Sequence, residues 1–96
     1  MTMEEFRRSL TAQAPPPLTS EVLIALWWDA KGDWDAAHRT VDSLDTREGM
    51  AVHAYLHRKE GDIGNAEYWY RRAGGEYRRE KLDEEWHTLV EALLPD

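Results

Sequence analysis

The chain contains no cysteine among its 96 residues. This absence excludes disulfide bridges, thiolate catalysis, iron–sulfur clusters and cysteine-ligated zinc. Long apolar runs are also missing, since no stretch approaches the roughly 18 residues of a membrane span. Met1 is followed by the charged residues Glu4, Glu5 and Arg7 where a secretory signal would place an apolar segment. We therefore expect a cytoplasmic protein that makes no use of a membrane.

Positive charge is scarce relative to negative charge. The chain has 12 Lys and Arg against 19 Asp and Glu, a formal net charge of −7. Proteins whose main ligand is a nucleic acid usually carry a basic surface that releases counterions on contact, so this class of function is not expected. Cations cluster only in residues 71–81, where Glu76 and Glu80 interrupt them. A solvated helix end and loop is the preferred interpretation of this segment, and nucleic-acid contact is the weaker alternative.

Apolar residues make up 42% of the chain, with five tryptophans and four tyrosines. This length and composition predict one domain over residues 1–96, of the all-α class, with about five helices. Residues 1–17 form a weak helical leader that ends in the break at Pro15, Pro16 and Pro17. We expect this leader to be separable or loosely docked.

Two helical hairpins are predicted, over residues 19–45 and 46–74. In the first, Thr19 or Ser20 is the N-cap of a helix that ends at Gly32, and Asp33 caps the next helix. In the second, Asp45 and Glu48 form a capping pair, and the helix runs to about Glu60. Four residues then form the next apolar stripe: Ile63, Ala66, Tyr70 and Ala73.

A final amphipathic helix is predicted over residues 82–94. Its apolar residues fall at offsets of three and four, which places them on one helix face opposite a strongly acidic face. They are Leu82, Trp86, Leu89, Val90, Leu93 and Leu94.

An internal repeat relates the two hairpins. A shift of 29 residues aligns three features: Ala25 with Ala54, Gly32–Asp33 with Gly61–Asp62, and Ala37 with Ala66. Small residues permit close approach of the two helices of a hairpin, and each Gly–Asp supplies a left-handed turn followed by an N-cap. With these residues, the stretch 21–73 resembles two degenerate units of the tetratricopeptide family.

The resemblance implies a fold and a ligand-binding face. Stacks of this family usually need about three units, so the final helix is expected to act as a cap. Peptide ligands of the family lie along the first helices, a face that here would include Val22, Leu26, Asp29, Tyr55, Arg58 and Lys59. Tyr55 beside two cations suits an acidic or C-terminal peptide. Alternatively, Arg58 and Lys59 only complement the dipole of a last helical turn.

The aromatic runs Trp27–Trp28 and Tyr68–Trp69–Tyr70 also point to a surface function. Consecutive residues on a helix are about 100° apart, so each run must direct some rings to a surface or an interface. Trp69 is therefore added to the candidate partner-binding residues Tyr55, Arg58 and Lys59.

Three histidines form the candidate metal site. A tight turn near residues 45 and 46 makes the flanking helices antiparallel, so residues whose numbers sum to about 91 lie at one height. His38 then faces His53, and Trp34 faces His57. His53 and His57 share a helix face at a spacing of four residues. The alternative is that these histidines are partly buried and hydrogen-bonded to neighbours or stacked on Trp34.

The sequence thus leaves two functional hypotheses. The first is a non-catalytic helical-repeat module that binds a protein or peptide, or a second copy of itself. The second is a small metal-binding protein that uses His38, His53 and His57. No catalytic residue and no cofactor are predicted, because no serine has a strand–turn–helix context and no glycine-rich loop cradles phosphate. The protein is not expected to be an enzyme.

Overall fold

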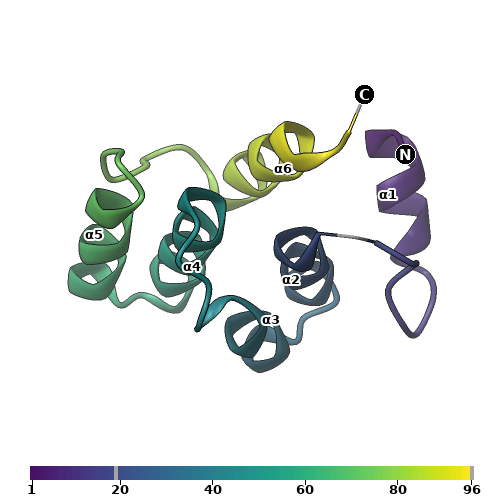
Figure 1. Cartoon of the computed structure of the whole chain (residues 1–96), viewed down its shortest axis with the longest axis horizontal. Helices are drawn as coiled ribbons and strands as arrows, with labels where there is room; N and C mark the ends of the chain where they lie inside the picture. Colours follow the sequence, from purple (N-terminus) through teal and green to yellow (C-terminus); the bar gives the residue numbers. More distant parts are fainter. Residues whose placement is uncertain (19, 96) are drawn as a thin grey trace.

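A computed structural model describes residues 1–18 and 20–95 (Figure 1). Regular secondary structure in this part of the chain is entirely helical, which confirms the all-α class. The six helices, close to the expected number, are α1 (Met3–Ser9), α2 (Glu21–Ala30), α3 (Trp34–Val41), α4 (Arg47–Glu60), α5 (Ile63–Arg72) and α6 (Leu82–Leu93). None of the six is long and apolar enough to cross a membrane.

The repeated Gly–Asp pairs end one helix and begin the next. Gly32 and Gly61 have φ values of 87° and 89°, in the left-handed region that glycine adopts without steric strain. The side chains of Asp33 and Asp62 accept hydrogen bonds from the backbone N–H groups three residues ahead. Ser20 caps α2 by accepting a hydrogen bond from the Leu23 N–H. Its alternative, Thr19, lies outside the described residues.

The predicted capping pair of Asp45 and Glu48 is wrong. Thr46 is the N-cap of α4, and its hydroxyl oxygen accepts a hydrogen bond of 3.0 Å from the Gly49 N–H. The chain between α3 and α4 is packed tightly at this point, since a Cβ atom added to Gly49 would lie 2.8 Å from the Leu44 Cβ atom. The N-cap of α4 therefore lies one residue later than predicted. The same turn brings the backbone of Gly49 so close to Leu44 that only glycine fits there.

Helices α2 to α4 each pack against the next helix in the chain, and α6 packs against α2 and α4 (Figure 1). The α2–α3 and α4–α5 pairs form the two hairpins. The repeat alanines Ala25, Ala37, Ala54 and Ala66 have no exposed surface, which agrees with their predicted role at the closest approach of paired helices. Ile63 departs from the predicted stripe, because the first residue of α5 lies at its end and remains 46% exposed.

The leader is docked, contrary to the expectation of a loose attachment. Phe6 of α1 is fully buried in the main core, with its ring centroid 6.0 Å from that of Trp86 on α6. The indole N–H of Trp27, on α2, donates a hydrogen bond of 3.1 Å to the Ser9 hydroxyl. One large aromatic side chain therefore anchors α1 in the groove between α2 and α6.

A buried carboxylate ties α6 to the second hairpin. Glu85 is 1% exposed, and it accepts hydrogen bonds from the Arg58 guanidinium at 2.5 Å and the Tyr70 hydroxyl at 2.6 Å. Burial raises the pKa of the Glu85 carboxyl, while its two donors act in the opposite direction. A buried charge is tolerated here because both of its oxygen atoms are bonded.

The two glycines around Asp62 provide a matched test of this fold. We expect Gly61→Ala to lower the free energy of unfolding by about 1–2 kcal/mol, because alanine must adopt the left-handed conformation. Gly64→Ala, inside α5, should raise it by about 0.5 kcal/mol. An added Cβ meets no atom within 4 Å at either position, so the difference isolates the backbone. Urea denaturation measures both values, and equal effects would contradict the assigned turn.

Candidate metal centre

The connection between α3 and α4 sets the register of the candidate site. It spans residues 42–46 and makes the two helices antiparallel neighbours. We predicted that residues whose numbers sum to about 91 face each other across this turn. His38 does face His53, and their Nε2 atoms are 3.1 Å apart. Trp34 faces His57, with 5.9 Å between ring centroids. The turn thereby brings together side chains that are separated by 15 positions (His38 and His53) and 23 positions (Trp34 and His57) in the sequence.

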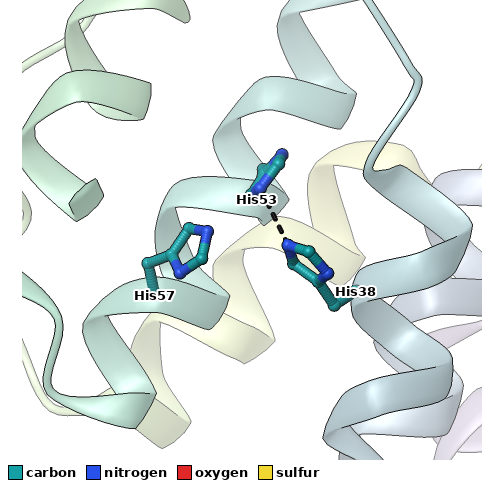
Figure 2. A group of neighbouring side chains, drawn as sticks. All are labelled: His38, His53 and His57. Carbon is teal, nitrogen blue, oxygen red and sulfur yellow. Dashed lines mark hydrogen bonds between the residues drawn. The ribbon is translucent and has the colours of Figure 1, made fainter.

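Three imidazole rings converge there, His38 from α3 and His53 and His57 from consecutive turns of α4 (Figure 2). One ring nitrogen from each histidine lies within 4.8 Å of those of the other two. His53 and His57 are 2% and 7% exposed, whereas His38 is half-buried at the edge of the group. The cluster is therefore buried on the side of His53 and His57 and reaches the surface at His38.

Tryptophans hold two of these rings in place. Trp34 stacks on His38, with 4.9 Å between centroids and 7° between planes. Trp69, on α5, stacks on His53 at 4.0 Å and 14°. Stacking of His38 on Trp34 is the structural role considered as the alternative to metal binding. Hydrogen bonding to neighbours, the other part of that alternative, is present as well, because the Nε2 atoms of His38 and His53 share a hydrogen bond of 3.1 Å that a metal would have to replace.

His53 is a neutral imidazole with an incomplete set of hydrogen bonds. Burial, with the neighbouring His38 and His57 as smaller causes, lowers its pKa from 6.5 to about 4. Within the described chain its Nδ1 atom is buried and has no hydrogen-bond partner. A buried polar atom without a partner typically costs about 1–3 kcal/mol. The fold therefore holds an uncharged, under-bonded ring at the centre of the cluster.

Glu60 supports the third ring and was missed in the sequence. Its Oε1 atom is 3.2 Å from Nδ1 of His57. Because an ionised carboxylate only accepts hydrogen bonds, this contact places the imidazole hydrogen on Nδ1 and leaves the Nε2 lone pair free. The spacing of three residues on one helix face could have revealed the pair. Asp62 lies near both, in a second group of potential ligand atoms.

The cluster matches the ligand geometry of a transition metal. Two imidazole nitrogens on one tetrahedral zinc, each about 2.0–2.1 Å from the ion, stand about 3.3 Å apart. The Nε2 atoms of His38 and His53 are separated by 3.1 Å. A nitrogen of His57 lies within 4.8 Å of the other two ligand atoms, so a shift of its side chain would bring all three to the spacing of one ion. Three histidines leave a fourth position for water or another ligand.

Of the four candidate partner-binding residues, Trp69 stacks on His53 in the cluster, and the other three lie outside it. Tyr55 is 2% exposed, and its hydroxyl donates a hydrogen bond to the buried Asp29. Arg58 is bonded to Glu85, on α6. Lys59 is partly exposed, but it forms an ion pair with Asp29 at 2.8 Å. This face is partly covered by α6, but Asp29, Tyr55 and Lys59 still line an open pocket of about 840 Å³ together with residues of α6.

Comparison of this chain with protein-family models, with curated proteins and with solved structures found no match. A function is therefore inferred from the residues and their arrangement. The histidine cluster is the place where burial, stacking and an unpaired polar atom coincide.

The lowered pKa of His53 predicts a pH dependence of the metal-free protein. Between pH 6.5 and about 4 the unfolded chain binds a proton at this position and the folded chain does not. The free energy of unfolding should therefore fall as the pH falls through this window. His53→Phe, which keeps a flat ring against Trp69, should show a shallower decline in Tm in the presence of a chelator. The control His87→Gln, a half-buried position outside the cluster, should retain the wild-type slope. Equal slopes for wild type and His53→Phe would contradict the assignment.

Proposed function

We propose that this protein binds one divalent transition-metal ion through His38, His53 and His57. The observation that carries the proposal is the convergence of one ring nitrogen from each histidine within 4.8 Å. Imidazole nitrogen suits zinc, copper and nickel, and a set without thiolate or carboxylate disfavours magnesium and calcium. Zinc is the first ion to test because it needs no redox partner and accepts three histidines readily.

The surroundings of the three rings support a metal over a purely structural cluster. His53 is uncharged at neutral pH, so a metal does not have to displace a proton from it. The carboxylate of Glu60 orients His57 in the way that outer-shell carboxylates orient zinc-binding histidines. Asp29 and Glu85, the buried acids, have both oxygen atoms bonded. The Nε2 atom of His53 faces His38 and would be the metal ligand, whereas its unpartnered Nδ1 atom is on the other side of the ring.

Metal binding would join the two hairpins. His38 belongs to the first hairpin and the other two histidines belong to the second. An ion that binds only the folded chain stabilises it by about 2.7 kcal/mol at a hundredfold excess over its dissociation constant. The ion would therefore act as a clamp between α3 and α4, and it would leave the fourth coordination position near the half-buried His38.

Zinc titration of the tag-free, chelator-treated protein tests this proposal. We expect uptake of one equivalent by calorimetry and a rise in Tm with zinc. His53→Phe keeps the ring stack but removes both nitrogens, and it should weaken binding by about 100-fold or more. Glu60→Gln should weaken it by about 10-fold, because the neutral amide orients His57 less strongly.

His87→Gln is the matched control, since His87 lies on α6 and is not part of the cluster. It should bind zinc as the wild type does. The metal proposal fails if the wild type takes up no zinc, or if His87→Gln weakens uptake as much as His53→Phe.

The second candidate function is association of the chain with itself. The observation that favours it is the attachment of α1, which reaches the core through a few side chains and is joined to α2 by a proline-containing segment.

We also propose that the two hairpins are tetratricopeptide-like units. The buried alanines and the repeated Gly–Asp turns support this likeness. Two such units leave ends that a second copy can cover.

A further inference from the structure

One acid lies at the edge where the histidine cluster reaches the surface. Asp42 is the C-cap of α3, four residues after His38, and its Oδ1 atom is 4.0 Å from Nε2 of His38. This Nε2 atom is the one that faces His53 and that we propose as a metal ligand. The side chain of Asp42 is 64% exposed and that of His38 is 25% exposed. The carboxylate of Asp42 therefore lies between the cluster and solvent.

The antiparallel register directs Asp42 and His57 toward the middle of the cluster. The backbone of Asp42 is still helical, with φ −55° and ψ −36°, and side chains on a helix lean toward its N-terminus. Asp42 thus leans toward His38, while His57 on the opposed helix leans toward His53. Each helix contributes two residues at a spacing of four, which share one helix face. The two pairs supply four potential ligands from opposite directions.

The two other acids near these rings have different roles. Glu60 contacts Nδ1 of His57, the nitrogen to which we assign the imidazole hydrogen. Asp62 is the N-cap of α5, and its carboxylate oxygen atoms accept hydrogen bonds from the first turn of that helix. Among the described residues, the carboxylate of Asp42 has no polar partner closer than His38. Asp42 is therefore the acid that is placed to bind the same ion as the histidines.

Charge also favours a carboxylate in the fourth position. Three neutral imidazoles leave the full double positive charge on a divalent ion, and such a charge is costly beside rings that are 2% and 7% exposed unless an anion is close. Carboxylate oxygen is a normal ligand of zinc. The 4.0 Å between Oδ1 of Asp42 and Nε2 of His38 must shorten to about 3.3 Å on a tetrahedral ion. Rotation of an exposed side chain can supply this change.

From this placement we infer that Asp42 supplies the fourth ligand, so that the protein holds its ion in a closed site of three histidines and one aspartate. This assignment rests on the proposed metal-binding function and identifies the remaining ligand of the same site. Structural zinc sites are four-coordinate and closed, whereas catalytic sites keep one position for water or substrate. With Asp42 bound, the ion has no position for a substrate and acts as a clamp between α3 and α4.

Cobalt(II) tests this assignment, because the visible spectrum of bound Co²⁺ changes when an added anion enters an open coordination position. The tag-free, chelator-treated protein is loaded with one equivalent of Co²⁺ and titrated with azide. We expect a four-coordinate spectrum that azide does not change. In Asp42→Ala, azide should shift the spectrum, because it displaces a water molecule from the freed position. This variant should also bind Co²⁺ about 10-fold or more weakly, since loss of even an outer-shell partner costs about that much.

Asp45→Ala is the matched control, because it removes the same charge from an exposed position in the same connection. It should bind Co²⁺ and resist azide as the wild type does. Metal-free Asp42→Ala should keep the wild-type circular dichroism spectrum, which separates a lost ligand from a lost fold.

Two results separate failure of this assignment from failure of the metal proposal. If the wild type takes up one equivalent of Co²⁺ and azide shifts its spectrum as in Asp42→Ala, the fourth ligand is water. The assignment of Asp42 is then wrong, and so it is if Asp42→Ala matches the wild type in affinity and azide response. In both cases metal binding by the histidines stands. A wild type that takes up no Co²⁺ overturns the three-histidine site and its fourth ligand together.

Discussion

The connection between α3 and α4 is the constraint on which the rest of the candidate site depends. It fixes the antiparallel register that puts His38 opposite His53, with 3.1 Å between their Nε2 atoms. Its tightness in turn relies on Gly49, since any side chain there would collide with Leu44. The conformation of this turn thus determines which histidines of α3 and α4 face each other. The flanking tryptophans, Trp34 and Trp69, then fix the orientation of the rings.

Two kinds of buried polar group occur in this small core. Asp29 and Glu85 are charged groups whose oxygen atoms are bonded by tyrosine hydroxyls and by Lys59 or Arg58. They join helices that are distant in the sequence, and the structure satisfies them from within. The buried imidazole of His53 differs, because its Nδ1 atom has no partner in the described chain. The Nε2 atom of the same ring is the one that faces His38 and that we propose as the metal ligand.

Local features of the sequence predicted much of the fold. The Gly–Asp pairs, the buried alanines and the facing histidines all follow from spacing along one helix or across one turn. The docking of Phe6 and the covering of Tyr55 by α6 did not. They depend on contacts between segments more than 25 residues apart, which helical periodicity does not encode. Glu60 differs from these, because its spacing of three residues from His57 is visible in the sequence, whereas the contact between the two side chains is seen only in the structure.

The central claim is that one ion is held by His38, His53 and His57 together. X-ray absorption at the zinc edge of the zinc-loaded, tag-free protein tests it most directly, because imidazole rings give a characteristic multiple-scattering pattern. The account predicts three imidazole nitrogens at about 2.0–2.1 Å and one additional light atom. A spectrum with one imidazole or none, or one that is unchanged in His53→Phe, would contradict it.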